Sequence, residues 1–372
     1  MQKRKNYKIL FLTRSFPPTI GGMENFTFGL YSHLKRIENI KLIANKRSYR
    51  GLLPFSLYIL IYTLLFSYRY DLVYCNDILT CFFAFPAKII YRKPMVSTLF
   101  GLDLNFVLKG DVTLTMKILK KIYKGIISFP KRYVNEFIPI SKGTAQLAKK
   151  CGIKTHRIIT PGIEKTDIHI SKSIKEIYRN KIRKKYSINK QKKILLFLGR
   201  IIKRKGLHWF LENIFFTFKD TYQLIIVGGG NDIEDAKRII TKYHFDKHTN
   251  ILGRVPENLK QTLFLGSDIF ILPNIKVKDH WEGFGMVAIE ASQYGTPVVA
   301  ASLEGITSAV IPNKNGLLYR PGYVKDCIEK INTVSQWEIN PNKISKFTNE
   351  NFSNERLARL YSEAFLSILK KE

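Results

Sequence analysis

The sequence predicts an α/β protein with two domains, each built around a parallel sheet. Short apolar runs such as residues 194–198 and 269–272 alternate with stretches of helical periodicity. The order strand, loop, helix, strand repeats along the chain and is typical of parallel units. With 372 residues and 45% hydrophobic content, the chain is large enough to bury two cores.

Each domain contains a series of apolar runs that predict strands. The first domain has them near residues 8–13, 71–75, 95–99 and 137–140, and the second has them at 194–198, 223–227, 269–272 and 297–301. A basic, polar segment at 165–192 is expected to link the domains. The last predicted helix, 354–370, follows the capping residue Ser353 and carries an apolar stripe.

Residues 51–68 form an uncharged stretch of eighteen residues, the lower bound for a membrane span. Pro54 shortens its helical part, and the stretch leads directly into the predicted strand at 71–75. A span here would break the α/β alternation. We therefore expect a helix packed between the first sheet and solvent or a membrane.

A glycine-flanked loop follows the predicted strand at 269–272 and runs into an apolar helix. It contains Glu282, Gly283, Phe284 and Gly285, and Glu290 lies in the helix. Ligands of parallel α/β sheets bind beyond the carboxyl ends of the strands, where this loop must lie, and the amides near Gly285 can meet an anion. The alternative is that Glu290 is an ordinary exposed helix residue, although its apolar neighbours make an unpaired carboxylate costly there.

A second motif follows the strand at 194–198, where Gly199 and Gly206 enclose a basic run. Glycine allows close approach of the backbone to a ligand. Arg200 and Lys205 provide a guanidinium and an ammonium, a pairing suited to a diphosphate. They could instead be solvated charges, as we expect Lys203 and Arg204 to be. Together the two motifs predict a site for a nucleoside diphosphate.

The order Gly-Arg-x4-Lys-Gly, then Glu-x7-Glu, resembles the retaining, nucleotide-sugar-dependent glycosyltransferases of family 4. Further segments fall in that family's order: 8–13, Gly21-Gly22, 139–141, 160–164, 224–230 and 314–318. The resemblance implies the GT-B fold, in which two Rossmann-like domains face a central cleft. It implies an acceptor-binding domain over 1–164, a nucleotide-sugar-binding domain over 193–352, and a helix at 353–372 that packs back on the first domain.

The resemblance also implies roles for single residues. Arg200 and Lys205 would hold the donor diphosphate and stabilise the leaving group, and Glu290 would bind the ribose. Glu282 would hold hydroxyls of the transferred sugar, which makes Arg200, Lys205 and Glu282 the expected catalytic residues. Donor contacts are further implied for the backbone at Gly21, Gly22, Gly199, Gly283, Phe284 and Gly285.

One position departs from the family pattern. Family members commonly carry a His-Gly-x-Asp-like segment, and here Phe100 stands at the place of the histidine, followed by Gly101 and Asp103. An imidazole cannot act at this position, but Asp103 can orient a sugar or acceptor hydroxyl. In the front-face mechanism usually proposed for retaining enzymes of this class, the leaving phosphate takes the acceptor proton, so no protein base is required.

The net charge of +32 is unusually high and indicates an anionic partner or an anionic surface that the protein contacts. Residues 1–163 hold 27 Lys and Arg against 7 Asp and Glu, so the excess is concentrated in the first domain. An anionic membrane surface explains it best, ahead of codon bias and of nucleic acid, for which no motif is present. The four cysteines are scattered and no signal peptide is expected, which favours the cytoplasm and the inner face of the cytoplasmic membrane.

These expectations combine into a glycosyltransferase that moves a sugar with retention from a nucleotide-diphosphate sugar, most simply a UDP- or GDP-sugar. The expected acceptor is a lipid-linked saccharide of cell-surface polysaccharide or glycolipid assembly. No cofactor or metal is expected, since the chain has no Asp-x-Asp and the two cations can balance the diphosphate. The alternatives are a nucleotide-sugar epimerase or hydrolase of the same fold, or an inactive scaffold that binds nucleotide sugar at a membrane.

Overall fold

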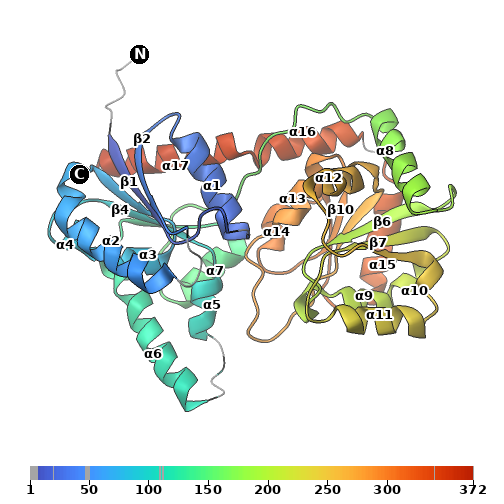
Figure 1. Cartoon of the computed structure of the whole chain (residues 1–372), viewed down its shortest axis with the longest axis horizontal. Helices are drawn as coiled ribbons and strands as arrows, with labels where there is room; N and C mark the ends of the chain where they lie inside the picture. Colours follow the sequence, from blue (N-terminus) through green and yellow to red (C-terminus); the bar gives the residue numbers. More distant parts are fainter. Residues whose placement is uncertain are drawn as a thin grey trace. The chain divides into compact units, whose positions relative to one another are not determined.

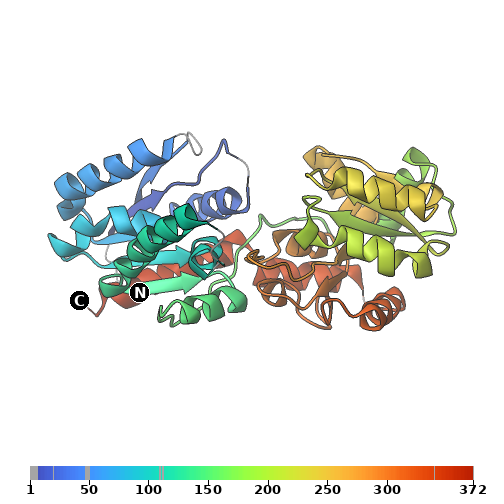
Figure 2. The ribbon, with the colours of Figure 1, turned by 90° about the horizontal axis from the view of Figure 1, so that it is seen from below.

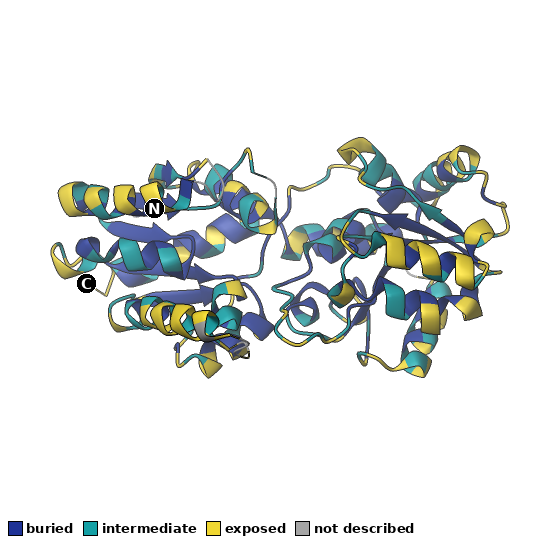
Figure 3. Cartoon of the chain, turned by 60° about the horizontal axis from the view of Figure 1, so that its bottom comes forward, coloured by how far each residue is buried: buried dark blue, intermediate teal, exposed yellow. Residues whose placement is uncertain are grey.

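The computed structural model describes residues 7–19, 21–46, 51–108, 110, 113–338 and 340–371. They divide into two compact units: Met1–Glu164 with Phe352–Glu372, and Lys165–Asn351. Each unit has its own parallel sheet with helices on both faces (Figures 1 and 2). The strands are buried, and the helices turn their exposed residues outward (Figure 3).

The described residues of the first unit form a five-stranded sheet in the order β2-β1-β3-β4-β5. Its strands are β1 (Lys8–Thr13), β2 (Asn39–Ala44), β3 (Leu72–Cys75), β4 (Met95–Leu99) and β5 (Glu136–Pro139). All neighbours pair in parallel. The chain moves from β1 outward to β2 and then from β3 outward to β5, so the strand order reverses between β1 and β3. Ligands of open α/β sheets bind at such a reversal.

The helices of the first unit cover both faces of this sheet. They are α1 (Gly22–Leu34), α2 (Leu52–Phe66), α3 (Ile78–Phe83), α4 (Phe85–Ile89), α5 (Leu102–Leu108), α6 (Leu114–Ser128), α7 (Lys142–Lys150) and α17 (Asn354–Leu369). Helices α1 and α17 pack on one another over one face. There Phe11, Tyr74 and Tyr361 form an aromatic core, with Tyr74 4.6 Å from Phe11 and 5.5 Å from Tyr361 between ring centroids. The C-terminal helix is thus part of the first unit's core.

Helix α2 occupies the stretch in which the sequence predicted a packed helix. It contacts α3 and α4, and Pro54 lies in its first turn, where a missing N–H costs nothing. Among the described residues, Leu52–Arg69 is the one helical stretch long and apolar enough to cross a membrane, and only 22% of it is buried. The α/β alternation continues through it into β3, as expected.

The described residues of the second unit form a six-stranded parallel sheet in the order β11-β10-β9-β6-β7-β8. Its strands are β6 (Lys193–Leu198), β7 (Tyr222–Val227), β8 (Thr249–Ile251), β9 (Ile269–Leu272), β10 (Val298–Ala301) and β11 (Gly316–Tyr319). From β6 the chain moves toward β8, and from β9 it moves the other way toward β11. The strand order therefore reverses between β6 and β9.

The helices of the second unit again form two layers. They are α8 (Lys172–Lys185), α9 (Leu207–Asn213), α10 (Phe215–Phe218), α11 (Ile233–Lys242), α12 (Glu257–Gly266), α13 (Met286–Gln293), α14 (Ile306–Ala309), α15 (Val324–Ser335) and α16 (Pro341–Asn351). Phe210, Ala236 and Ile331, from α9, α11 and α15, share a core with the sheet. Helix α8 packs on α12, and α13 packs on α16.

The segment 165–192, expected as a linker, contains α8 and is grouped with the second unit. The reason is close packing on α12, where Ile182 is buried and the backbone of Arg179 lies beside Gly266. Three strands were not among those predicted, namely β2, β8 and β11. They lie at sheet edges, and β2 alternates polar and apolar residues with only Ile43 fully buried, so it lacks the continuous apolar run of a central strand.

Candidate functional site

Three loops meet at the carboxyl edge of the second sheet, beside the reversal of strand order. They follow β6, β9 and β10 and carry Gly199–Gly206, Pro273–Gly285 and Ser302–Gly305. Ile275 N–H donates to the carbonyl of Arg204 at 3.1 Å, and Gly305 N–H donates to the carbonyl of Glu282 at 3.1 Å. Backbone hydrogen bonds alone therefore join the three loops.

The carboxylate of Glu282 lies at the centre of these loops. Its Oε2 atom accepts from Lys205 Nζ at 2.7 Å, from Asn274 Nδ2 at 3.2 Å, and from the guanidinium of Arg204. The side chains of Glu282, Arg204 and Lys205 are 14%, 14% and 11% exposed, so water screens them weakly. One carboxylate is shared by two cations, and this cluster keeps a positive excess.

Burial and charge act in opposite directions on Glu282 and Lys205. Burial alone would raise the pKa of the Glu282 carboxyl, but the charges of Lys205 and Arg204 outweigh burial and hold that pKa at about 2. Burial lowers the pKa of the Lys205 ammonium, and Glu282 offsets part of this effect. Glu282 is therefore ionised at neutral pH and cannot donate a proton.

Glycines allow the loops of this edge to approach closely. Gly206 has a φ of 71°, and a Cβ there would lie 1.7 Å from the carbonyl oxygen of Pro273. Gly228, after β7, has a φ of 129°, and its Cβ would lie 1.9 Å from the carbonyl oxygen of Gly199. A Cβ at Gly199 itself would meet no atom within 4 Å. The Gly199 backbone therefore faces open space while its neighbours hold it in place.

The structure corrects the expectation for Arg204. The sequence predicted a solvated side chain, but Arg204 is largely buried and bonds Glu282. Arg200, predicted to act with Lys205, is exposed, and its charge lowers the pKa of Lys205, so it lies near it. Arg204 and Lys205 belong to a short 3₁₀ turn, residues 203–205, from which both side chains reach Glu282.

Glu304 is a further residue of this edge that the motifs did not reveal. It follows β10, has a φ of 45°, and its carboxylate accepts the backbone N–H of Glu282. Burial and the charge of Glu282 raise the pKa of the Glu304 carboxyl. A non-glycine residue in the left-handed region next to a charge cluster is typical of a functional site.

Two polar atoms beside Glu282 have no partner. Oδ1 of Asn274 and Nε1 of Trp281 are buried without a hydrogen bond within the described chain. Both residues line a small cavity with Arg204, Glu282 and Glu304. A buried acceptor and a buried donor that lack partners are costly unless a ligand or water completes them.

The loop after Glu282 continues into α13 through Gly283, Phe284 and Gly285. Gly285 adopts a φ of 93° and precedes the first turn of α13, and Phe284 is buried. No side chain caps this helix end, so its first amides remain available for an anion. Glu290, in the second turn, is 20% exposed and pairs with Lys260 of α12 at 3.2 Å. Lys260 therefore balances the charge of Glu290, for which the sequence alone indicated no partner.

The carboxyl edge of the first sheet holds a second charge cluster. Arg14, after β1, donates to Asp77 after β3 at 2.9 Å and to Asp103 at 3.1 Å, and Tyr123 Oη donates to Asp103 at 2.7 Å. Burial raises the pKa of the Asp103 carboxyl, and Arg14 opposes this effect. Asp103 was predicted from its motif. Arg14, Asp77 and Tyr123 were not, because only the strand order brings them to it.

The remaining predicted positions of the first unit have simple surroundings. Gly21 precedes α1 without a side-chain cap, and Gly22 has open space where a Cβ would lie. Phe100, at the place of the family's histidine, is 7% exposed, and its ring packs 5.1 Å from that of Phe26 between centroids. Its apolar surroundings suit phenylalanine. Within the described residues, no group of three or more His, Cys, Asp or Glu side chains could hold a metal ion.

Comparison with known proteins gives the same family that the motifs indicated. Residues 178–351 match the family described as glycosyl transferases group 1. An uncharacterized glycosyltransferase of Methanocaldococcus jannaschii is 23% identical over 260 residues, 68% of this chain and 63% of that protein. The N,N'-diacetylbacillosaminyl-diphospho-undecaprenol alpha-1,3-N-acetylgalactosaminyltransferase of Campylobacter jejuni is 27% identical over 258 residues, again 68% and 63%. The chain therefore spans less than two thirds of each relative.

Solved structures share the fold of the whole chain. The Anabaena protein Alr3699/HepE, in complex with UDP, has a TM-score of 0.71 at 20% identity, over 97% of this chain and 100% of that one. Sucrose-phosphate synthase from Thermosynechococcus elongatus has a TM-score of 0.73 at 15% identity, over 98% and 100%. These likenesses confirm the predicted GT-B fold of two Rossmann-like domains.

The Glu282 cluster predicts a stability change with a defined pH dependence. Glu282→Gln leaves Lys205 and Arg204 without a countercharge and should lower the free energy of unfolding by about 3 kcal/mol at pH 7. Because the pKa of Glu282 in the folded state lies below its usual value, the difference in free energy of unfolding between wild type and Glu282→Gln should be constant above pH 5. It should shrink as the pH falls from about 4.5 toward 2.

Urea unfolding across this pH range measures both effects. Glu234→Gln is the control, because Glu234 is 70% exposed in its pair with Lys237 and should change stability by less than about 1 kcal/mol. Equal effects of the two substitutions would show that the Glu282 cluster is not a buried charge network.

The glycine contacts give a second, matched comparison. Gly228→Ala places a Cβ 1.9 Å from the Gly199 carbonyl oxygen at an unfavourable φ, and should cost about 2–4 kcal/mol. Gly229→Ala, one residue on, meets no atom within 4 Å and should be close to neutral. Urea midpoints of the two variants measure this difference, and similar midpoints would contradict the close packing of the loops.

Proposed function

We infer that this chain, whose residues 178–351 belong to the group 1 glycosyl transferases, transfers a sugar from a nucleotide-diphosphate sugar to an acceptor. The observation that carries the proposal is the buried cluster of Lys205, Arg204 and Glu282 at the strand reversal of the second sheet. Arg204 and Lys205 share the carboxylate of Glu282, and Arg200 lies near Lys205. These three cations outnumber the carboxylates of Glu282 and Glu304, so a positive charge is left for an anionic ligand. A departing diphosphate is the group that such a charge stabilises.

The donor would use the backbone of the same edge. Its phosphates would meet Lys205 and the uncapped first turn of α13. Its sugar hydroxyls would lie near Glu282, and the ribose would reach Glu290. The Anabaena neighbour was crystallised with UDP and with UDP-glucose, which favours a uridine donor for this chain.

Retention of configuration and the type of acceptor are finer parts of this proposal. Glu282 is held by two cations and is poorly placed to attack the sugar, which favours front-face substitution, with the leaving phosphate taking the acceptor proton. The names of the Campylobacter relative and of a putative teichuronic acid glycosyltransferase of Bacillus subtilis support a lipid-linked saccharide of cell-surface assembly as acceptor. The Arg14–Asp77–Asp103 cluster offers charged groups that can orient acceptor hydroxyls.

We propose further that the first unit lies on the cytoplasmic face of an anionic membrane. Helix α2 is apolar on both faces: Ile59 is buried together with Ser56 and Thr63, while large apolar side chains on the other face are 44–71% exposed, namely Leu53, Leu57, Tyr58, Ile61, Leu64 and Leu65. Helix α6 exposes Ile118, Leu119 and Ile122 between lysines. Both helices contact α3. Apolar residues with surrounding lysines are typical of helices that bind anionic lipid.

Thermal unfolding with a panel of UDP-, GDP-, ADP- and dTDP-sugars tests the donor site. A donor at one hundred times its dissociation constant stabilises the folded state by about 2.7 kcal/mol, roughly a 5 °C shift for a unit of this size. The shift should appear with one nucleotide family and be lost in Lys205→Ala. Lys203→Ala, an exposed lysine of the same turn, should keep it.

No shift with any nucleotide sugar, in a folded sample, would contradict the donor site.

For the donor that binds, proton NMR of the sugar released by slow hydrolysis tests whether the anomeric configuration is retained. The first-formed sugar should keep the anomeric configuration of the donor, and the opposite anomer would contradict retention. Fast release of free sugar, unchanged by any acceptor, would favour the hydrolase alternative.

Flotation with vesicles containing phosphatidylglycerol tests the membrane surface. Leu57→Glu with Ile61→Glu should lower the bound fraction about tenfold, because both side chains would enter the lipid interface. Phe216→Glu is the matched control, since Phe216 is 64% exposed but belongs to α10 of the second unit. Equal binding of the two variants would contradict α2 as the docking element.

A further inference from the structure

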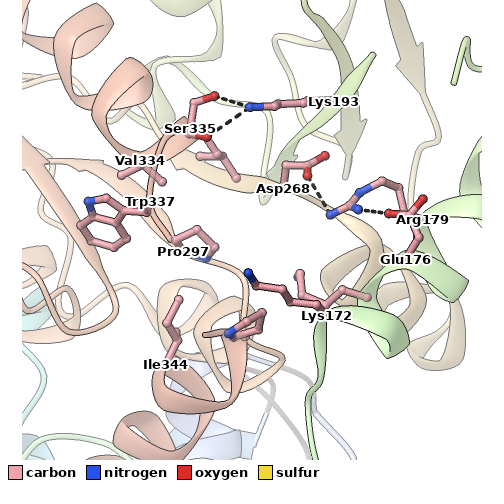
Figure 4. Close-up of a pocket in the computed structure, with 14 residues that line it drawn as sticks. Lys172, Glu176, Arg179, Lys193, Asp268, Pro297, Val334, Ser335, Trp337 and Ile344 are labelled. Carbon is pink, nitrogen blue, oxygen red and sulfur yellow. Dashed lines mark hydrogen bonds and ion pairs between the residues drawn. The ribbon is translucent and has the colours of Figure 1, made fainter. Parts of the chain in front are cut away.

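A second cavity opens at the amino edge of the second sheet, the end opposite the Glu282 cluster (Figure 4). It is lined where β6, β9 and β10 begin, by Lys193, Ile269 and Pro297, and by residues of α8, α15 and α16. Strand β6 runs six residues from Lys193 to Leu198, about 20 Å at 3.3 Å per residue. A ligand here would not compete with the donor for space.

The cavity carries an excess of positive charge. Its wall contains Lys172, Lys175, Arg179 and Lys193 against Glu176 and Asp268. Arg179 bonds both carboxylates, and its pair with Asp268 measures 2.7 Å. None of the three lysines has an ion-pair partner among the residues that the structure describes. The two carboxylates are occupied by Arg179. Lys175 and Lys193 donate to the neutral groups of Thr296 and Ser335, so their positive charge is left for an outside anion.

Lys175 is the most unusual of these groups. It is 4% exposed, and its Nζ donates to Thr296 Oγ1 at 2.6 Å. An ammonium has three donors, and burying one with a single neutral partner is costly. Burial lowers the pKa of Lys175 to about 7, despite the opposing charge of Asp268. The Nε atom of Arg179, on the same wall, is buried without a partner within the described residues.

The other wall of the cavity is apolar. Val334, Trp337, Pro341 and Ile344 line it beside Pro297. Figure 4 shows Trp337 and Ile344 across the cavity from Arg179, and Lys193 bonded to Ser335. An indole and a proline ring can cover the flat face of a sugar or another ring. A ligand that fits both walls has an anionic group at one end and a ring at the other.

We propose that this cavity binds a small phosphate ester carried on a ring, such as a sugar phosphate, with Lys172, Lys175 and Lys193 around the phosphate. The site lies apart from the proposed donor site and does not depend on it. Binding would charge Lys175, which then pairs with the phosphate. The titratable groups that face Lys175 are Asp268, Glu176, Arg179, Lys172 and Lys193.

Isothermal titration calorimetry with glucose 6-phosphate, inorganic phosphate and glucose tests this proposal. All titrations use the Lys205→Ala background, so that phosphate at the donor cluster does not contribute. Glucose 6-phosphate should bind at least tenfold more tightly than inorganic phosphate, and glucose should not bind. Equal affinity for the two phosphates would overturn the assignment of a ring to the apolar wall.

Substitutions on α8 separate the roles of the lysines. Lys175→Met, which keeps the length of the side chain, should weaken binding at least tenfold. Lys172→Met removes an exposed charge and should weaken it several-fold. Lys181→Met is the control, since Lys181 is exposed on the same helix and does not line the cavity. Unchanged affinity in both Lys172→Met and Lys175→Met would overturn the site.

The pH dependence provides an independent readout. Because binding takes up a proton at Lys175, affinity should fall up to tenfold per pH unit between pH 7.5 and 9, where the phosphate stays dianionic. This slope should persist in Lys172→Met and vanish in Lys175→Met. Without ligand, Lys175 binds fewer protons in the folded state than in the unfolded state between pH 7 and 10. Its contribution to the free energy of unfolding therefore rises with pH over this range. A flat binding profile in the wild type would contradict the role of Lys175.

Discussion

The carboxylate of Glu282 is the contact on which the candidate donor site depends. This carboxylate accepts from Lys205 and Arg204, and so joins its own loop to the loop that follows β6. Asn274 of its own loop donates to the same oxygen, and the backbone N–H of Glu282 donates to Glu304 of the loop that follows β10. The two cations cannot be buried without it, and it cannot be buried without them. The charge that we propose to hold the donor diphosphate and the positions of the loops are therefore set by the same residues.

The sequence was sufficient for the fold and for part of this site. The apolar runs that predict β6 and β9 also predict which residues follow these strands. Lys205, Glu282 and Glu290 could therefore be assigned to the carboxyl edge of the sheet from the sequence. Arg204 and Glu304 were not predicted, because a 3₁₀ turn and a left-handed φ decide where their side chains point. Arg14 and Asp77 are 63 residues apart and meet only because β1 and β3 are neighbours. Three of the four edge strands were not predicted either; in β2, exposure on one side removes the continuous apolar run, whereas the buried edge strand β5 was predicted.

Buried charges are paired in some parts of the two units and left without an opposite charge in others. At both carboxyl edges, buried carboxylates balance buried cations, as Asp77 does for Arg14 and Glu282 does for Lys205. At the amino edge of the second sheet the lysines lack such partners. Helix α2 exposes leucines and an isoleucine on the face that does not pack on the core. Ordinary folding does not favour either feature, and we propose a partner outside the chain for each: a phosphate ester for the lysines and a lipid surface for α2.

A crystal structure with bound uridine diphosphate tests the central claim most directly. The account predicts that the terminal phosphate lies within hydrogen-bond distance of Lys205 Nζ, with the first amides of α13 completing its contacts. The ribose should lie toward Glu290. A diphosphate bound elsewhere at full occupancy, with the Lys205–Glu282 pair untouched, would contradict the account, because the buried cations would then serve the fold alone.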